Sequence, residues 1–174
     1  MEESCRVVFL GESGAGKTCI ISRYINGVYE DCTDSTTGAS YAAKNIEVQG
    51  RALNLEIWDT PGQEKYRALT KIFYKDASIV ILVYDVTKRE TLEEIKNYWY
   101  NQVKNEGMQN VIIGIAGNKC DEGDKEIVSA NEGREFARSI GAEFELTSAS
   151  GNIGIDDLIL RLAGRYFRKG NAPT

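Results

Sequence analysis

Short apolar stretches alternate along the chain with longer segments of helical periodicity. In residues 53–59 apolar and polar side chains alternate with a period of two, which predicts a half-buried strand. Residues 78–85 form a continuous β-branched and apolar run, typical of a strand that is covered on both faces. In residues 91–107 the apolar side chains recur instead at helical spacing, so this segment is predicted to be a helix that ends at a glycine.

The same patterns divide most of the chain into strands and helices. Further strands are predicted at 7–10, at 40–48, within 111–121 and at 142–149, and further helices at 18–25, 129–141 (capped by Ser129) and 154–169. The turn signal Q-G-R joins the strands at 40–48 and 53–59 into a hairpin. This order predicts an α/β fold: a six-stranded, mostly parallel sheet with one antiparallel strand at or near an edge and about five helices on both faces.

Length and composition narrow the possibilities. The 174 residues suit one domain, which we place at residues 1–169, followed by a disordered tail at 170–174. A net charge of −5 without a basic run disfavours nucleic acid as a partner. The acidic N-terminus and the lack of a long apolar run predict a cytoplasmic protein without a signal peptide. The chain has no histidine and its four cysteines form no CxxC pair, so a histidine base is excluded and a zinc site is disfavoured.

The segment "GESGAGKT" at residues 11–18 matches G-x-x-x-x-G-K-[ST] and lies between a predicted strand and a predicted helix. Its glycines let backbone N–H groups point inward and form an anion nest at a helix N-terminus. Lys17 can bridge the outer phosphates, and the Thr18 hydroxyl can ligate Mg²⁺. An ordinary glycine-rich turn requires neither residue, so we interpret the segment as a triphosphate site.

The segment "GNKCD" at residues 117–121 follows another predicted strand, at the edge where such sheets bind ligands. The Asp121 carboxylate can accept hydrogen bonds from N1–H and the 2-amino group of guanine. Adenine has neither donor and would leave the carboxylate unpaired, so this loop favours guanine over adenine.

Five motifs together resemble those of the Ras-like small GTPases, and within them the Rab-like branch: "GESGAGKT", "STTGASY", "WDTPGQEKY", "GNKCD" and "TSASGN". The similarity covers residues 4–169. It implies a P-loop NTPase fold in a monomeric G domain that binds GTP or GDP with Mg²⁺. It also implies slow GTP hydrolysis and regulation by an exchange factor and a GTPase-activating protein. The same resemblance implies effector proteins as partners and a role in vesicle and protein transport. It also implies a location on the cytoplasmic face of endomembranes, which the protein would reach only through a lipidated tail.

The resemblance also implies roles for individual residues. Gln63 would orient the attacking water and Lys17 would stabilise the γ-phosphoryl charge. Mg²⁺ would be held by Thr18, Thr36 and, through water, Asp59. An effector surface would include Tyr41, Trp58 and Phe73, although aromatic residues on strands and helices are also typical of a core. Nucleotide contacts would come from Ser13, Gly14, Ala15, Gly16, Lys17, Thr18, Cys19, Tyr29, Thr36, Gly62, Asn118, Lys119, Asp121, Ser148, Ala149 and Ser150.

Several positions depart from the family pattern. Pro61 stands where alanine is usual, and Ser150 where lysine is common. The end "RKGNAPT" lacks the cysteine of a prenylation signal, and we interpret it as the beginning of a longer variable tail. Two alternatives remain: a P-loop kinase, for which we see no lid arginines, and a nucleotide-binding scaffold with little hydrolysis, which Pro61 makes the more credible of the two.

Overall fold

The computed structural model describes residues 2–29, 39–62 and 64–170. Six strands form one sheet in the order β2-β3-β1-β4-β5-β6. Only the β2–β3 pair is antiparallel, and β2 lies at the edge, so the predicted α/β sheet is confirmed. The strands are β1 (Glu3–Leu10), β2 (Ser40–Val48), β3 (Arg51–Asp59), β4 (Ile79–Asp85), β5 (Ile112–Asn118) and β6 (Glu143–Leu146).

Five helices accompany this sheet in the described part of the chain, because α3, the π-helical turn η2 and α4 run on continuously as one helix. Two short 3₁₀ turns complete the secondary structure. The helical elements are α1 (Lys17–Asn26), η1 (Glu64–Tyr66), α2 (Arg67–Tyr74), α3 (Arg89–Glu94), η2 (Ile95–Trp99), α4 (Tyr100–Glu106), η3 (Gly123–Lys125), α5 (Ala130–Ser139) and α6 (Ile155–Gly170).

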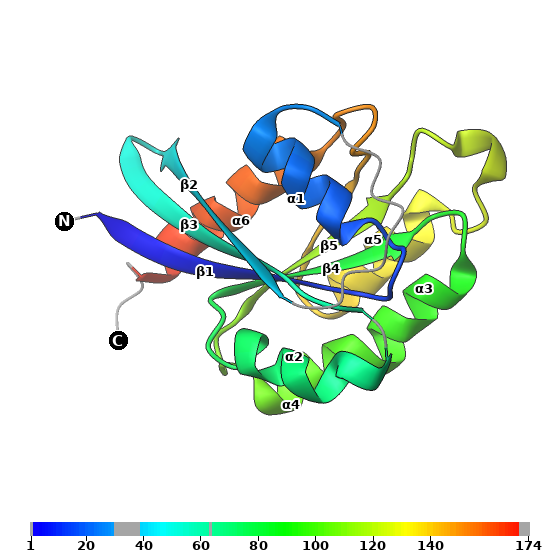
Figure 1. The fold of residues 1–174 in the computed structure, drawn as a ribbon, viewed down its shortest axis with the longest axis horizontal. Coiled ribbons are helices and arrows are strands. Elements are labelled where there is room, and N and C mark those ends of the chain that lie inside the picture. Colours follow the sequence, from blue (N-terminus) through cyan, green and yellow to red (C-terminus); the bar gives the residue numbers. More distant parts are fainter. Residues whose placement is uncertain (1, 30–38, 63, 171–174) are drawn as a thin grey trace.

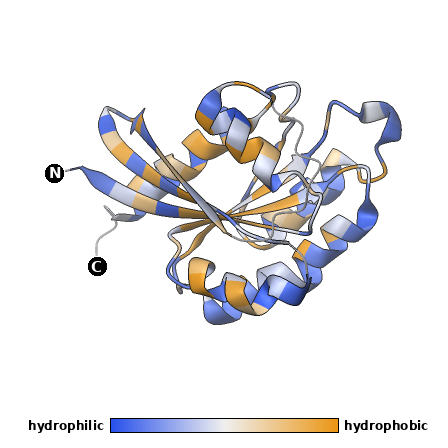
Figure 2. Cartoon of the chain, in the orientation of Figure 1, coloured by the Kyte–Doolittle hydropathy of each residue, from blue (hydrophilic) through white to orange (hydrophobic). Residues whose placement is uncertain are grey.

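The helices cover both faces of the sheet (Figure 1). One apolar cluster joins α1 and α6 to one face, and a second joins α2, α3, η2, α4 and α5 to the other. All seven residues of β4 are buried between these layers, as the continuous apolar run predicts. Figure 2 shows the same division, with apolar residues concentrated in the central strands and hydrophilic residues on the outer sides of the helices.

Local sequence signals explain several element ends. Gln49 and Gly50 both have positive φ, the geometry of a two-residue hairpin turn, so pairing extends to Val48 and Arg51. The Ser129 side chain accepts a hydrogen bond from the Glu132 N–H, and this confirms the predicted cap. The last strand is shorter than predicted: it ends at Leu146, because Ser148 exchanges two backbone hydrogen bonds with Ile153 in a turn.

The sheet gathers the ends of its parallel strands at one edge. β1, β4 and β5 all run in the same direction, so the segments that follow Leu10, Asp85 and Asn118 emerge side by side. The sequence motifs at 11–18 and 117–121 are two of these segments. Within the described ranges, no helix combines the length and the apolar character needed to cross a membrane.

Candidate functional site

The loop between β1 and α1 is a close-packed backbone cradle. A Cβ on Gly11 would collide with the Val83 carbonyl, and one on Gly16 would collide with the Asn118 side-chain amide. Gly16 also has a φ of 102°, a conformation that residues with a side chain rarely adopt. These two positions therefore require glycine, as a cradle that brings backbone N–H groups close to a ligand would.

Lys17 lies buried at the base of this cradle. Its ammonium donates hydrogen bonds to the Gly11 carbonyl at 2.8 Å and to the Glu12 carbonyl at 3.1 Å. Burial lowers the pKa of Lys17 to about 8, while the charges of Asp59 and Glu12 act in the opposite direction. A buried cation that is held by neutral carbonyls gains from an anionic ligand, and phosphate supplies one.

Thr18 and Asp59 bring together oxygen atoms of the kind that Mg²⁺ prefers. The Thr18 hydroxyl donates to Asp59 Oδ2 at 2.6 Å. Asp59 Oδ1 is buried and accepts no hydrogen bond from the described residues. Burial raises the pKa of Asp59, and the Thr18 hydrogen bond and the Lys17 charge oppose this shift. A hydroxyl beside a buried carboxylate with a spare oxygen fits a magnesium ion.

The segment after β3 lies directly on the cradle. Thr60 is buried and donates its hydroxyl to the Phe9 carbonyl at 2.6 Å. A Cβ on Gly62 would collide with backbone atoms of Ser13, Gly11 and Glu12, so its backbone is within contact distance of the cradle. Thr36, which is predicted to hold Mg²⁺, and Gln63, which is predicted to orient the attacking water, lie outside the described residues.

Asn118 and Lys119 fasten the loop after β5 to the cradle. The Asn118 amide donates to the Ala15 carbonyl at 2.9 Å, and its oxygen accepts from the Thr147 hydroxyl at 3.1 Å. The Lys119 ammonium donates to the Gly14 carbonyl at 3.0 Å. The two sequence motifs, more than 100 residues apart, thus form one site.

Two serine hydroxyls hold the Asp121 carboxylate. Ser148 donates to Oδ1 at 2.7 Å, and Ser150 donates to Oδ2 at 2.9 Å. These hydrogen bonds, the Ser148 bond first, hold the pKa of Asp121 below its ordinary value. Ser150, which departs from the usual lysine, therefore contributes a second hydroxyl to the carboxylate.

A pocket of about 200 Å³ lies between these loops. Eight of its nine lining residues are ones for which the sequence predicts a nucleotide contact, and Glu122 is the addition. The lining residues are Gly16, Cys19, Tyr29, Asn118, Lys119, Asp121, Glu122, Ala149 and Ser150. The pocket adjoins the cradle at Gly16, so a ligand with a base in the pocket can extend its phosphates towards Lys17.

Sequence reasoning missed one residue that supports this pocket. Arg23 of α1 donates to the Ala149 carbonyl at 2.7 Å and to the Ser150 carbonyl at 2.8 Å. It thereby ties the loop that carries Ser148 to the helix that begins at the cradle. An arginine in an amphipathic helix gives no sequence signal for partners about 126 residues away.

Tyr41, Trp58 and Phe73 form a continuous aromatic row on β2, β3 and α2. Their ring centroids are 4.9 Å apart for Tyr41–Trp58 and 5.1 Å apart for Trp58–Phe73. Tyr41 is 51% exposed, whereas Trp58 and Phe73 are half-buried. The row is thus neither an internal core nor isolated side chains, but a ridge with one end open to solvent.

Comparisons with known proteins agree with this geometry. The model of the Ras family matches residues 6–167. The chain is 37% identical over 160 residues to the Ras-related protein Rab-22A of Homo sapiens, with 92% of this chain and 82% of the relative covered. It is 37% identical to Rab-8A of Gallus gallus, covering 97% and 84%, and 35% identical to Rab5 of Nicotiana tabacum, covering 95% and 82%.

Proposed function

The chain belongs to the Ras family of small GTPases, and we propose that it works as a Rab-like switch that binds GTP or GDP with Mg²⁺ and slowly hydrolyses GTP. One observation carries the assignment of guanine. The Asp121 carboxylate, oriented by Ser148 and Ser150, lines a pocket that opens onto the cradle around Lys17. It can pair with two adjacent donors of a base, and guanine presents two.

Hydrolysis proceeds by in-line attack of water on the γ-phosphorus. The new P–O bond forms as the bond to the β–γ bridging oxygen breaks, and GDP leaves together with inorganic phosphate, which carries the protons of the attacking water. Lys17 and the backbone amides of the cradle stabilise the charge on the transferred group, and Gln63 orients the water. Bound Mg²⁺ supplies a Lewis acid for the phosphate oxygens, and Thr18, Asp59 and Thr36 would hold it.

The slow rate makes the protein a timed switch. The motifs contain no evident internal arginine finger, and a finger supplied by an activating protein increases such rates by about 10³–10⁵-fold. Loss of the γ-phosphate releases Thr36 and Gly62, so the two segments that carry them change conformation. In the chain, Tyr41 on β2 follows Thr36, and Trp58 on β3 and Phe73 on α2 lie on either side of Gly62. The aromatic row Tyr41–Trp58–Phe73 is therefore the surface on which effectors would read the change. A role in vesicle transport is the biological context that we propose.

The first test is the identity and fate of the bound nucleotide. We expect denatured, purified protein to release GDP, and protein loaded with GTP to hydrolyse it slowly in Mg²⁺, more slowly still with Gln63→Leu. Bound adenine nucleotide, or none, would refute the guanine assignment. GTP that persists equally in both proteins would favour a binding scaffold with little hydrolysis.

A pair of variants tests the base pocket directly. In Asp121→Asn the new amide can donate to a carbonyl, so the protein should lose affinity for GDP and gain affinity for xanthosine diphosphate, which has a carbonyl in place of the 2-amino group. Glu122→Gln is the matched control, because this carboxylate lines the same pocket but has no assigned base contact. It should keep the preference for GDP.

A further inference from the structure

Asp85 is a buried carboxylate that none of the nucleotide motifs accounts for. It is the last residue of β4, is 0% exposed, and lies opposite Asn118 in the register of β4 with β5. An ionised side chain in such a position is costly unless it is paired and hydrogen-bonded. The groups around the Asp85 carboxylate therefore show which partners compensate its charge.

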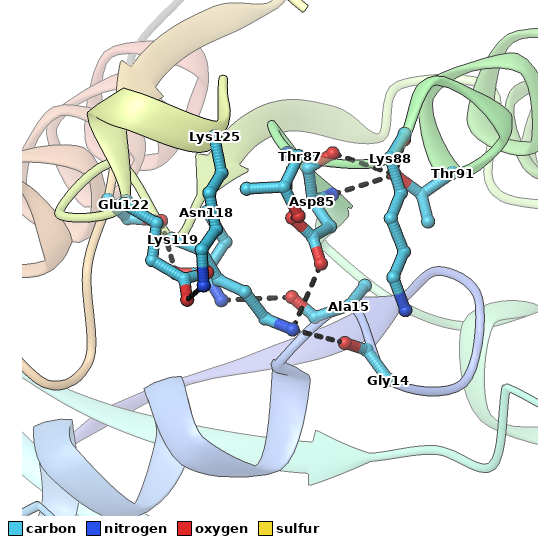
Figure 3. Close-up of polar contacts among 11 residues, drawn as sticks. Gly14, Ala15, Asp85, Thr87, Lys88, Thr91, Asn118, Lys119, Glu122 and Lys125 are labelled. Atoms are coloured by element: carbon cyan, nitrogen blue, oxygen red, sulfur yellow. Dashed lines mark hydrogen bonds and ion pairs between the residues drawn. The ribbon is translucent and has the colours of Figure 1, made fainter. Parts of the chain in front are cut away.

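The two oxygens of Asp85 have different partners. Oδ1 accepts hydrogen bonds from the backbone N–H of Thr87 at 2.8 Å and from its hydroxyl at 2.6 Å. Oδ2 is buried and accepts no hydrogen bond from the described residues, and it forms an ion pair with the Lys119 ammonium, 2.9 Å away (Figure 3). One oxygen thus fixes the turn after β4, and the other is left for Lys119.

Lys119 is held at both ends. Its ammonium sits between Asp85 Oδ2 at 2.9 Å and the Gly14 carbonyl at 3.0 Å (Figure 3). Its backbone has a φ of 66°, which a residue with a side chain keeps only where the surroundings impose it. Since both ends are fixed, the aliphatic stem between them has little freedom, and Lys119 is one of the residues that line the base pocket.

We propose that Asp85 is a positioning residue for the base pocket: it anchors the Lys119 ammonium, and so keeps the Lys119 stem against the face of the bound base and slows nucleotide release. This inference rests on the proposed guanine-nucleotide site. A purely structural ion pair would stabilise the fold but would not act on nucleotide release through Lys119.

The variant Asp85→Asn separates these roles. Asparagine has the same shape and keeps one oxygen for Thr87, but it presents an amide instead of a carboxylate oxygen to the ammonium. We expect it to release GDP about tenfold faster or more, which corresponds to about 1.4 kcal/mol. Thr87→Val is the matched control, since it removes a hydroxyl from Oδ1 without changing Oδ2, and it should release GDP within about twofold of the unaltered protein.

A double-mutant cycle with Lys119→Met shows whether the effect passes through the lysine. Methionine keeps an apolar stem but lacks the ammonium. In this background Asp85→Asn should change GDP release by less than about twofold, because the contact that it removes is already absent. If it speeds release by the same factor in both backgrounds, or has no effect on the unaltered protein, the proposal is wrong.

Two further outcomes are informative. If Asp85→Asn alone does not fold, we expect the double variant to fold. Its unfolding temperature should be no lower than that of Lys119→Met, because a neutral amide replaces an unpaired buried carboxylate. A double variant that is less stable than Lys119→Met, or does not fold, overturns the proposal. Absence of guanine nucleotide from the unaltered protein would instead refute the proposed function, so the two failures are distinguishable.

Discussion

Removing the Ser148 hydroxyl should weaken guanine binding far more than removing the Ser150 hydroxyl. Ser148 is completely buried, donates to Asp121 at 2.7 Å and accepts from the Gly151 N–H at 2.9 Å. Hydrogen bonds to charged groups contribute about 1.5–3 kcal/mol, so Ser148→Ala should speed GDP release by about 10- to 100-fold. Ser150 is exposed, and water can replace its hydroxyl, so Ser150→Ala should cost less than about fivefold.

The assay compares GDP with inosine diphosphate, which lacks the 2-amino group. GDP gives Asp121 two donors and inosine diphosphate gives it one, so a well-oriented carboxylate prefers GDP. If Ser148 acts by orienting Asp121, Ser148→Ala should reduce the preference for GDP as well as the affinity. Release rates are measured by displacement of a fluorescent nucleotide. Ser139→Ala, which removes an exposed hydroxyl on α5, is the control and should match the unaltered protein.

Two results would refute this reasoning. Equal acceleration of GDP and inosine diphosphate release in Ser148→Ala would mean that the serine supports the loop in general and does not orient the carboxylate. A larger effect of Ser150→Ala than of Ser148→Ala would mean that burial does not determine the strength of these two hydrogen bonds.

Three further predictions concern the cradle and the base-supporting loop. The pKa of Lys17 is lowered from 10.5 to about 8, and a bound phosphate favours the charged amine. GDP binding at pH 8.5 should therefore take up protons, and the affinity for GDP should weaken as the pH rises further. Calorimetry in two buffers of different ionisation enthalpy measures the proton uptake. Gly16→Ala should weaken GDP binding by about 10- to 100-fold, because the new Cβ would displace the Asn118 amide and alanine is strained at the positive φ of this position. The nucleotide content of the purified variant checks this. Arg23→Gln should release GDP about three- to tenfold faster, because the Ala149 and Ser150 carbonyls each lose a charged donor, as stopped-flow fluorescence would show.

Periodic segments and short motifs were the features that the sequence could predict. The continuous run of β4 and the amphipathic pattern of 91–107 have strong periods, and both elements are present in the structure. The sequence does not define the bounds of α2, because an isolated segment of eight residues, about two turns, shows too little periodicity.

Sequence patterns do not predict contacts between distant segments. Asp85 gives a partial signal, as a carboxylate that ends an apolar run, but its partner depends on the register of β4 with β5. Arg23 gives none, because its acceptors are backbone carbonyls and carry no residue identity. Motif residues are recognisable because their chemistry requires particular side chains, whereas supporting residues are selected by geometry that appears only after folding.

Pro61 is the departure from the family pattern whose effect on hydrolysis a single reversion to alanine can measure. Its neighbours Thr60 and Gly62 are both buried against the cradle and the end of β1, so the segment is held by contacts on either side of the proline. Pro61→Ala should therefore lower the free energy of unfolding by about 0.4–1 kcal/mol, through the greater freedom of the unfolded chain. Single-turnover hydrolysis should change by less than about threefold, which is about 0.65 kcal/mol in the barrier. An increase of more than about tenfold would mean that the proline itself suppresses hydrolysis, and would favour the binding scaffold over the GTPase switch.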